Sequence, residues 1–315
     1  MSMKFSIITP SYNMERWIAE TIESLLSQEG DFEIEHILAD GDSTDKTVAI
    51  FEEYRARLER GEISPRCKGV TMQSFSEKDK GTFDAINKGF ARATGDIYTW
   101  LDADNNYVPG ALNGIQKIFS SFPDVQWVKG YSSTMDEEGH VRWTRQTYLY
   151  HQDWLRKGIY GLESYHVNAD TVFWSADLWK KAGPLPLEYR CAGEQKLWIE
   201  MAKFSPLWAA NLYVSSYRKR DGSLSKDIER CRKEKKQARG NTTPLSAWGA
   251  RIFFSSQSRL YPKGEKFFLW LYPLLFMLTK KTEYIDFVND QPVKKTARTF
   301  IIGDHPSYAD ISSRI

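Results

Sequence analysis

Four short apolar runs alternate with amphipathic segments over the first hundred residues, and this alternation limits the folds open to the chain. The runs cover residues 4–9, 35–39, 69–74 and 96–101. Each has the length and composition of a strand, and the segments between them carry apolar residues at helical spacing. Strand and helix repeated in this order produce right-handed crossovers and a parallel sheet. We therefore predict an α/β fold with a mostly parallel central sheet flanked by helices.

Capping residues mark the expected starts of the helices. Asn13 is expected to cap the first helix, and Ser43 or Thr44 the second. The pattern becomes mixed in the second hundred residues, where we expect a helix over 111–122 and a strand over 125–129.

Composition excludes several classes of protein. The 315 residues are 41% hydrophobic and include 11 Trp, so we expect a packed core rather than a disordered or fibrous chain. A formal net charge of +2 does not fit a dedicated nucleic-acid binder, which would carry a strongly basic domain. The three cysteines, Cys67, Cys191 and Cys231, lack paired spacing. We therefore expect neither a disulfide framework nor a structural zinc site, and a reducing, cytosolic setting.

Two segments bear on membrane contact. The apolar block at 267–278 contains Pro273 and is shorter than the ~20 residues that span a bilayer. It fits either a buried C-terminal helix or an in-plane membrane contact. Residues 218–239 hold ten Lys or Arg against four Asp or Glu. That excess fits either a solvated helical face or attraction to an anionic membrane surface. The N-terminal residues 1–8 are too short and too interrupted for a signal peptide.

Acidic residues gather where the predicted strands end. Asp40 and Asp42 follow the second strand, and Asp102 and Asp104 follow the fourth. Ligands bind at the carboxyl edge of open α/β sheets, so these side chains are candidates for a ligand site. Two carboxylates one residue apart can bind Mg²⁺ or Mn²⁺ together with substrate phosphates. A turn or a helix cap is the alternative use of the same residues.

Several nucleotide-binding and hydrolase motifs are absent from the sequence. Neither GxGxxG nor GxxxxGK[ST] occurs, which argues against dinucleotide and P-loop nucleotide binding. There is no GxSxG nucleophile elbow and no HExxH metal pair, and the five histidines are scattered.

Four ordered motifs give the first hundred residues a resemblance to a known family. They are SIITPSYN at 6–13, ILADGDSTDKT at 37–47, SEKDKGTFDAINKGFARATGD at 76–96 and WLDAD at 100–104. In order and spacing they resemble glycosyltransferase family 2, which has the GT-A (Rossmann-like) fold of nucleotide-diphospho-sugar transferases. Residues 1–105 would then be the nucleotide-sugar-binding half and 106–225 the acceptor-binding half. The resemblance covers roughly residues 4–225, and beyond it we expect residues 226–315 to form a C-terminal helical extension open to membrane association.

The resemblance implies a base-binding group of residues. Thr9, Pro10 and Tyr12 would border the nucleotide base, with the aromatic ring of Tyr12 stacked on it. Asp40 would hydrogen-bond the edge of the base.

A second implied group would bind the rest of the donor. Asp79 and Lys80 would line the nucleotide pocket, with Lys80 able to neutralise phosphate. Asp102 would lie near the ribose, and Asp104 would bind the Mg²⁺ or Mn²⁺ that bridges the diphosphate. Asn105 stands where many relatives carry another Asp, which leaves the set of metal ligands open.

An inverting displacement also needs a base on the face of the sugar opposite the leaving group. The family places an acidic residue for this at the start of a helix in its second half, and CAGEQKLW at 191–198 resembles that stretch. Glu194 stands in the slot where relatives usually have Asp, so it is the expected catalytic base. A first-turn helix carboxylate is the alternative. Further along, Lys219 or Arg220 replaces the usual His of a loop that closes over the phosphates.

The resemblance thus implies an inverting, metal-dependent hexosyltransferase. It would move a sugar from a UDP-, GDP- or dTDP-linked donor to a glycan or lipid-linked acceptor, in surface polysaccharide or lipid-linked oligosaccharide synthesis. The QxxRW motif and the membrane spans of processive synthases are absent, so we expect a non-processive bacterial enzyme in the cytoplasm, at the inner face of the membrane. Two alternatives remain. One is a sugar nucleotidyltransferase, which would normally show a Gly-rich N-terminal segment, and the other is a non-catalytic binding module of the same fold.

Overall fold

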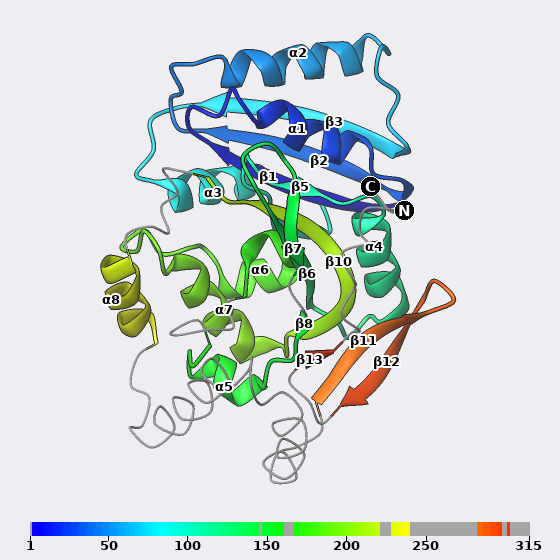
Figure 1. Ribbon diagram of the computed structural model, residues 1–315, viewed down its shortest axis with the longest axis vertical. Coiled ribbons are helices and arrows are strands. Elements are labelled where there is room, and N and C mark those ends of the chain that lie inside the picture. The colour runs from blue at the N-terminus through cyan, green and yellow to red at the C-terminus, as the bar shows by residue number, and fades with distance from the viewer. Residues whose placement is uncertain are drawn as a thin grey trace.

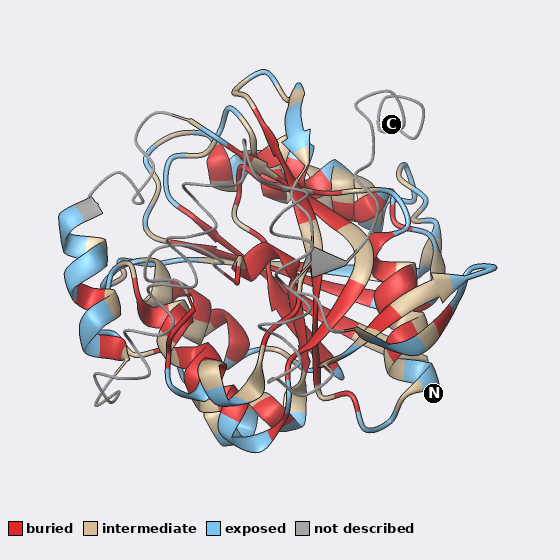
Figure 2. Cartoon of the chain, turned by 60° about the horizontal axis from the view of Figure 1, so that its bottom comes forward, coloured by how far each residue is buried: buried red, intermediate tan, exposed pale blue. Residues whose placement is uncertain are grey.

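The computed structural model of the chain describes residues 2–144, 147–160, 167–220, 228–239, 282–297 and 301–302. Its centre is a large sheet with helices on both faces (Figure 1). Buried residues follow the strands and the sides of the helices that face them, while the outer sides of the helices are exposed (Figure 2). The predicted α/β architecture with a flanked central sheet is confirmed.

The N-terminal part of the sheet is parallel, as predicted. Its strands are β1 (Met3–Ser11), β2 (Gly30–Asp40), β3 (Cys67–Ser76) and β4 (Ile97–Trp100). β1 lies between β2 and β4, in a register that pairs Ser11 with Asp40. β2 in turn pairs Asp40 with Ser76 of β3. The carboxyl ends of three strands therefore meet at Asp40.

Three helices connect these strands and cover both faces of the sheet. They are α1 (Ile18–Leu26), α2 (Thr47–Glu59) and α3 (Thr82–Phe90). Ile22 of α1 and Phe51 of α2 pack with Leu38 on one face of β2. Ile86 of α3 packs with Ile37, the preceding residue, which points to the opposite face.

The helix starts differ from the predicted ones. Asn13 does not cap α1; it has a left-handed φ of 54°, and its Oδ1 accepts a hydrogen bond from the N–H of Thr44 at 2.9 Å. Asp45, and neither Ser43 nor Thr44, accepts the first N–H of α2, that of Thr47, at 2.9 Å. Asn13 and Thr44 thus join the loops after β1 and β2, which brings the two strand ends into one edge.

The second half of the sheet is mixed. Its elements are β5 (Asn106–Tyr107), α4 (Ala111–Ser121), β6 (Trp127–Met135), β7 (Val141–Thr144), β9 (Val172–Ser175) and β10 (Trp208–Arg218). β9 runs antiparallel to both β4 and β6, whereas β10 is parallel to β6 and antiparallel to β5. The predicted helix over 111–122 and the predicted strand near 125–129 are both present.

Helices of the second half cover the other end of the sheet. They are the 3₁₀ turn η1 (Ala169–Thr171), α5 (Gln152–Arg156), α6 (Ala176–Ala182), α7 (Gly193–Phe204) and α8 (Ile228–Ala238). Tryptophans join α7 to the sheet. The rings of Trp100 and Trp198 stack with centroids 5.7 Å apart, and Trp174 meets both rings edge-on. This cluster fixes the start of α7 relative to the end of β4.

The described part of the C-terminal region combines a helix with strands that we did not predict. Besides α8, its described part contains the hairpin β11 (Thr282–Val288) and β12 (Gln291–Ala297), and β13 (Ile301–Ile302) paired with β8 (Thr147–Tyr148). The hairpin joins the edge of β10, so the strand order becomes β12-β11-β10-β6-β9-β4-β1-β2-β3. Residues 267–278 lie outside the described residues. No helix in the described ranges is long and apolar enough to cross a bilayer.

A disulfide between Cys191 and Cys231 contradicts the prediction that the cysteines are unpaired; Cys67 is free. The two residues are 40 positions apart, and they meet because α8 packs beside α7.

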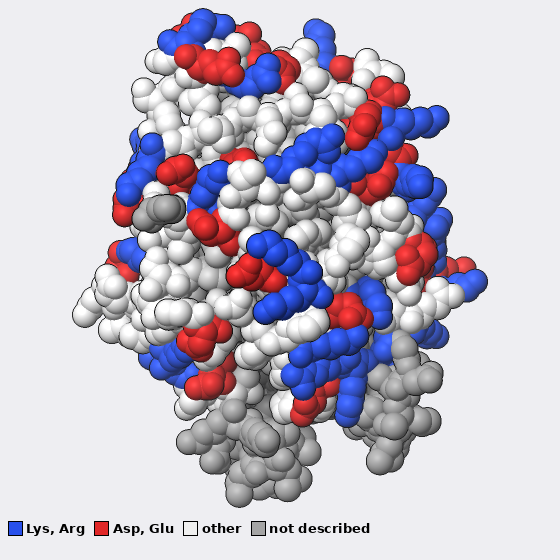
Figure 3. Space-filling model, turned by 180° about the vertical axis from the view of Figure 1, so that it is seen from behind, with Lys and Arg blue, Asp and Glu red and all other residues white. Residues whose placement is uncertain are grey.

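The basic side chains of residues 218–239 do not form one continuous exposed surface. Among the described residues of this segment, Arg218 is buried and Arg220 faces a cavity, whereas Lys219 and the outer side of α8 are exposed. On the back of the molecule, Lys and Arg occur in several separate groups with Asp and Glu among them (Figure 3).

Candidate active site

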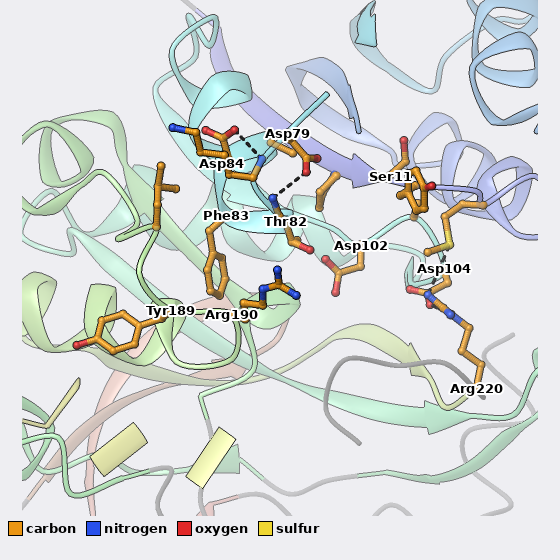
Figure 4. Close-up of a pocket in the computed structure, with 18 of the residues that line it drawn as sticks. Ser11, Asp79, Thr82, Phe83, Asp84, Asp102, Asp104, Tyr189, Arg190 and Arg220 are labelled. Atoms are coloured by element: carbon orange, nitrogen blue, oxygen red, sulfur yellow. Dashed lines mark hydrogen bonds and ion pairs between the residues drawn. The ribbon is translucent and has the colours of Figure 1, made fainter. Parts of the chain in front are cut away.

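A cavity of about 600 Å³ opens at the carboxyl edge of β1 and β4. Its wall combines the turns after these two strands, the loop into α3, the segment before α7 and the end of β10 (Figure 4). Its size is typical of a small-molecule or cofactor site. Six of the predicted site residues line it: Pro10, Tyr12, Asp79, Lys80, Asp102 and Asp104.

The turn after β1 supplies an open aromatic face. Tyr12 is 57% exposed, although it lines the cavity, so its ring is free to stack on a planar ligand. Asp79 also lines the cavity, and its Oδ1 accepts a hydrogen bond from the N–H of Gly81 at 2.7 Å. The main chain at Gly41 leaves room for this carboxylate, because a Cβ there would come within 2.5 Å of Asp79 Oδ2.

Thr9 and Asp40 do not line the cavity, in contrast to the positions implied for them. Thr9 is buried in β1, where its hydroxyl hydrogen-bonds His36 Nε2 at 2.9 Å. The carboxylate of Asp40 is 1% exposed. It accepts hydrogen bonds from the hydroxyls of Ser11, Ser43 and Ser76 at 2.6–2.7 Å and from the N–H of Ser43 at 2.8 Å. Asp40 therefore ties three strand ends together in this structure.

The turn after β4 carries two acidic side chains in a buried, charged environment. Burial, together with the carboxylates of Asp104, Asp170 and Glu194, raises the pKa of Asp102 to about 8, while Arg220 acts in the opposite direction. Asp104 forms an ion pair with the guanidinium of Arg220, which reaches over from the end of β10 (Figure 4). Within the described part of the chain, no hydrogen bond reaches the Asp102 carboxylate. Asp102 thus lies in a buried group of carboxylates, with the guanidinium of Arg220 close by.

A buried arginine supports this turn from below. Arg218 is 1% exposed and forms an ion pair with Glu20. Its Nε donates to the main-chain carbonyl of Asp104 at 3.0 Å, and its own N–H donates to Asn105 Oδ1 at 2.8 Å. Asn105 is thus buried and engaged below the turn. The side chain at position 105 is not one of the groups that face the cavity.

Glu194 lies beside the cavity and not in its wall. It is in the first turn of α7, directly after Gly193, whose Cα packs against the ring of Phe83 in the cavity wall. Together with Lys235 of α8 it lines a second, smaller pocket of about 20 Å³, enough for about one water molecule. Burial raises the pKa of Glu194 to about 7; Lys235 lowers that pKa and Asp170 raises it further.

Comparison with known proteins decides the family. The model of the family described as "Glycosyl transferase family 2" matches residues 6–171, just over half of the chain. The chain belongs to glycosyl transferase family 2.

Curated proteins match this family 2 chain over shorter stretches. An uncharacterized glycosyltransferase of Nostoc sp. is 30% identical over 119 residues, which are 38% of this chain and 34% of that protein. The poly(ribitol-phosphate) β-N-acetylglucosaminyltransferase TarS of Staphylococcus aureus is 32% identical over 106 residues, 33% of this chain and 16% of TarS. The chain thus matches about a third or less of the length of these relatives.

A structural match extends over most of this family 2 chain. The crystal structure of S. aureus TarS 1–349 in complex with UDP-GlcNAc aligns with a TM-score of 0.56 and 16% identity, over 83% of this chain and 76% of that one. The likeness shows that the two chains share the GT-A fold.

Two cationic side chains complete the cavity of this family 2 chain. Sequence reasoning left Lys219 and Arg220 as alternatives, and the structure places Arg220 in the wall. Sequence reasoning made no prediction for Arg190. Its guanidinium points into the cavity toward Asp102 and has no ion-pair partner among the described residues (Figure 4). The one available signal was its position directly before the CAGEQKLW stretch, four residues before Glu194.

The residues at the end of β4 fit a divalent cation. Asp102 and Asp104 supply hard oxygen ligands, and a cation here would offset the effects of burial and of the neighbouring carboxylates, which together raise the pKa of Asp102. Within the described residues, no group of three or more His, Cys, Asp or Glu is arranged to hold a metal. A cation here would take its remaining ligands from water and from a bound phosphate, as Mg²⁺ commonly does.

Proposed function

We propose that the chain is an inverting, metal-dependent glycosyltransferase that moves a hexose from a nucleoside-diphospho-sugar to an acceptor hydroxyl. The observation that carries the proposal is the cavity wall itself. It combines an open aromatic ring at Tyr12, paired carboxylates at Asp102 and Asp104, and the cationic side chains of Arg190 and Arg220. These are the groups that a base, a metal-bound diphosphate and a developing negative charge require.

Each part of the donor has a matching part of the site. The base stacks on Tyr12, beside Asp79 and within reach of Lys80 on the same wall. Asp102 and Asp104 would hold the Mg²⁺ or Mn²⁺, which would act as a Lewis acid on the diphosphate. Residues 1–105 thus form the donor half of the proposed enzyme.

The acceptor would enter from the side of residues 106–225. Glu194 lies beside this part of the cavity, and a pKa near 7 allows it to take a proton from the acceptor hydroxyl at neutral pH. Arg190 and Arg220 neutralise charge that accumulates on the leaving diphosphate. The acceptor class that we propose is a glycan or lipid-linked oligosaccharide of a surface polymer. The names of relatives support this class: TarS, and the minor teichoic acid biosynthesis protein GgaB of Bacillus subtilis, 30% identical over 116 residues.

The first experiment identifies the donor. UDP-, GDP- and dTDP-sugars are compared by thermal shift with Mn²⁺ present, because a ligand bound only by the native state raises the melting temperature. Release of nucleoside diphosphate is then measured for the donor that binds. We expect release that needs Mg²⁺ or Mn²⁺, is abolished by a chelator and falls at least ~100-fold in Asp104→Ala.

A matched control and a product analysis complete the test. Asp177→Asn removes an exposed carboxylate of α6 that forms an ion pair with Lys180, and should keep full activity. Proton NMR of the transferred sugar reports whether the anomeric configuration inverts. Full turnover in Asp104→Ala would refute the metal site, and cleavage between the two phosphates would point to a nucleotidyltransferase. Donor binding without either reaction would point to a binding module.

A further inference from the structure

Helix α8 is fastened to the segment that leads into α7. This segment, residues 189–194, carries Tyr189 and Arg190 of the cavity wall and ends at Glu194 (Figure 4). α8 lies beside α7 at the edge of the molecule (Figure 1). Contacts between α8 and the 189–194 segment therefore affect the positions of Arg190 and Glu194, which the proposed reaction uses.

Glu234 makes the polar part of that hold. Its Oε2 accepts hydrogen bonds from the main-chain N–H groups of Arg190 at 2.8 Å and of Cys191 at 2.7 Å. Its Oε1 accepts from Arg230 Nε at 2.9 Å, within α8. The carboxylate is only 7% exposed, and these bonds hold its pKa below the usual range against the effect of burial. A buried, charged acceptor bound to two consecutive N–H groups restrains the main chain at that point.

A covalent bond lies directly beside these hydrogen bonds. Cys191 is bonded to Cys231, one helical turn before Glu234 on α8. Both cysteines are partly exposed, so a soluble dithiol can reach them. On the same side of α8, Lys235 shares the small pocket with Glu194. Cys231, Glu234 and Lys235 of α8 thus all interact with the 189–194 segment.

We propose that α8 is a clasp for the acceptor side of the site, with Glu234 as the positioning residue and the Cys191–Cys231 bond as a part that a dithiol can open. Glu234 fixes the main chain at Arg190 and Cys191, and this places the guanidinium of Arg190 and the carboxylate of Glu194. The disulfide keeps α8 in place. The effect on turnover rests on the proposed function, whereas the hold on the main chain does not.

Opening the clasp is a balanced thiol–disulfide exchange. A thiolate of dithiothreitol attacks one sulfur of the bond, and its second thiol then closes the ring of the oxidised reagent. Cys191 and Cys231 each gain a proton and together take up two electrons. Cys231→Ser gives the same open state without a reductant. In that variant dithiothreitol should have no further effect, which excludes an action through Cys67.

The direct test measures hydrogen exchange of peptides that cover 189–194. Glu234→Ala, Cys231→Ser and the reduced wild-type protein should each exchange about tenfold faster there. Glu234→Gln keeps an oxygen acceptor and should fall between wild type and Glu234→Ala. Glu229→Gln removes an exposed carboxylate from the first turn of the same helix and should exchange like wild type. Unchanged exchange in both the reduced protein and Glu234→Ala would overturn the clasp.

Turnover supplies a second readout, which would not change if Glu234 only stabilised the fold. In Glu234→Ala, kcat for transfer should fall about tenfold, while donor affinity changes little because most donor contacts lie on the opposite wall. The midpoint of the pH–kcat profile should also rise. When α8 is released, the positive charge of Lys235 moves away from Glu194, and the carboxylates of Asp170 and Asp102 raise the pKa of Glu194. If hydrogen exchange in Glu234→Ala is faster but the wild-type protein has no transferase activity, the proposed function is refuted and the clasp stands. If Glu234→Ala transfers normally and its exchange is unchanged, the clasp is refuted and the proposed function stands.

Discussion

The main-chain N–H of Arg218 donates a hydrogen bond to the side chain of Asn105, 2.8 Å away, and the Arg218 side chain reaches the carbonyl of the preceding Asp104. The end of β10 is thereby joined to the turn after β4, although the two segments are more than a hundred residues apart in the sequence. The geometry of Asp102 and Asp104 depends on this junction as much as on their own strand.

Loss of Arg218 should therefore destabilise the protein as well as the turn. Arg218→Met removes the side-chain donor to the carbonyl of Asp104 and one of the donors to the carbonyl of Glu137, and it breaks the ion pair with Glu20. We expect a loss of about 3 kcal/mol in the free energy of unfolding. Urea denaturation measures it. Arg66→Met, at an exposed ion pair with Glu29, should cost less than about 1 kcal/mol, and equal losses in the two variants would contradict the assignment.

Arg220 should compete with a metal ion for Asp104. In the donor-free protein its guanidinium is paired with that carboxylate, so Arg220→Ala should bind Mn²⁺ about threefold or more tightly when no donor is present. The same variant should bind the nucleotide donor more weakly, because a cation near the diphosphate is lost. Mn²⁺ titration followed by electron paramagnetic resonance checks the first effect. Arg16→Ala removes an arginine that also stacks on Trp17 but pairs with Glu137, so it should leave Mn²⁺ binding unchanged.

The predicted parts of the fold and site are those that follow from local pattern. Strand ends and helix faces are encoded by residues a few positions apart, so Asp102, Asp104 and Tyr12 could be placed at one edge from the sequence. Thr9 shows where that reasoning stops. It lies next to Pro10, but successive strand residues point to opposite sides, and its hydroxyl turns to His36.

Residues that depend on distant contacts could not be placed in this way. Asp40 is at the predicted edge, yet three serines from separate segments surround its carboxylate. Arg190 enters the cavity through a segment that α8 holds, and the Cys191–Cys231 bond depends on the same packing. No periodicity in the sequence reports such contacts, because they join elements whose relative positions are set by the whole core.

The activity of the enzyme should depend on pH through Glu194. Its pKa is raised to about 7, so below that value the carboxyl group is protonated and cannot accept the proton of the acceptor hydroxyl. We expect kcat to rise between about pH 6 and pH 8 and then level off. Initial rates across this range with saturating donor provide the measurement. Glu194→Gln should lose most activity and show no such rise; a Gln variant with the wild-type profile would exclude Glu194 as the base.

The membrane contact predicted from the basic segment would involve helix α8. Arg232 and Lys233 are exposed on α8, so they can approach a lipid surface. We expect the protein to co-sediment with vesicles that contain anionic phospholipid at low salt, and to be released at high salt. The Arg232→Gln/Lys233→Gln variant should bind less. Arg66→Gln/Lys68→Gln removes two exposed charges before and within β3 and should bind as wild type; equal binding by all three proteins would place any contact elsewhere.

Gly41 should control the donor pocket through the space that it leaves for Asp79. A Cβ at position 41 would lie 2.5 Å from Asp79 Oδ2, too close for the carboxylate to stay where it is. The backbone of Gly41 does not have a positive φ, so Gly41→Ala should fold normally and move the Asp79 side chain alone. We expect the nucleotide donor to bind about tenfold more weakly, measured by calorimetric titration, with little change in melting temperature. Gly69→Ala adds a Cβ where no atom lies within 4 Å, so donor affinity should be unchanged there; wild-type affinity in Gly41→Ala would remove Asp79 from the proposed donor site.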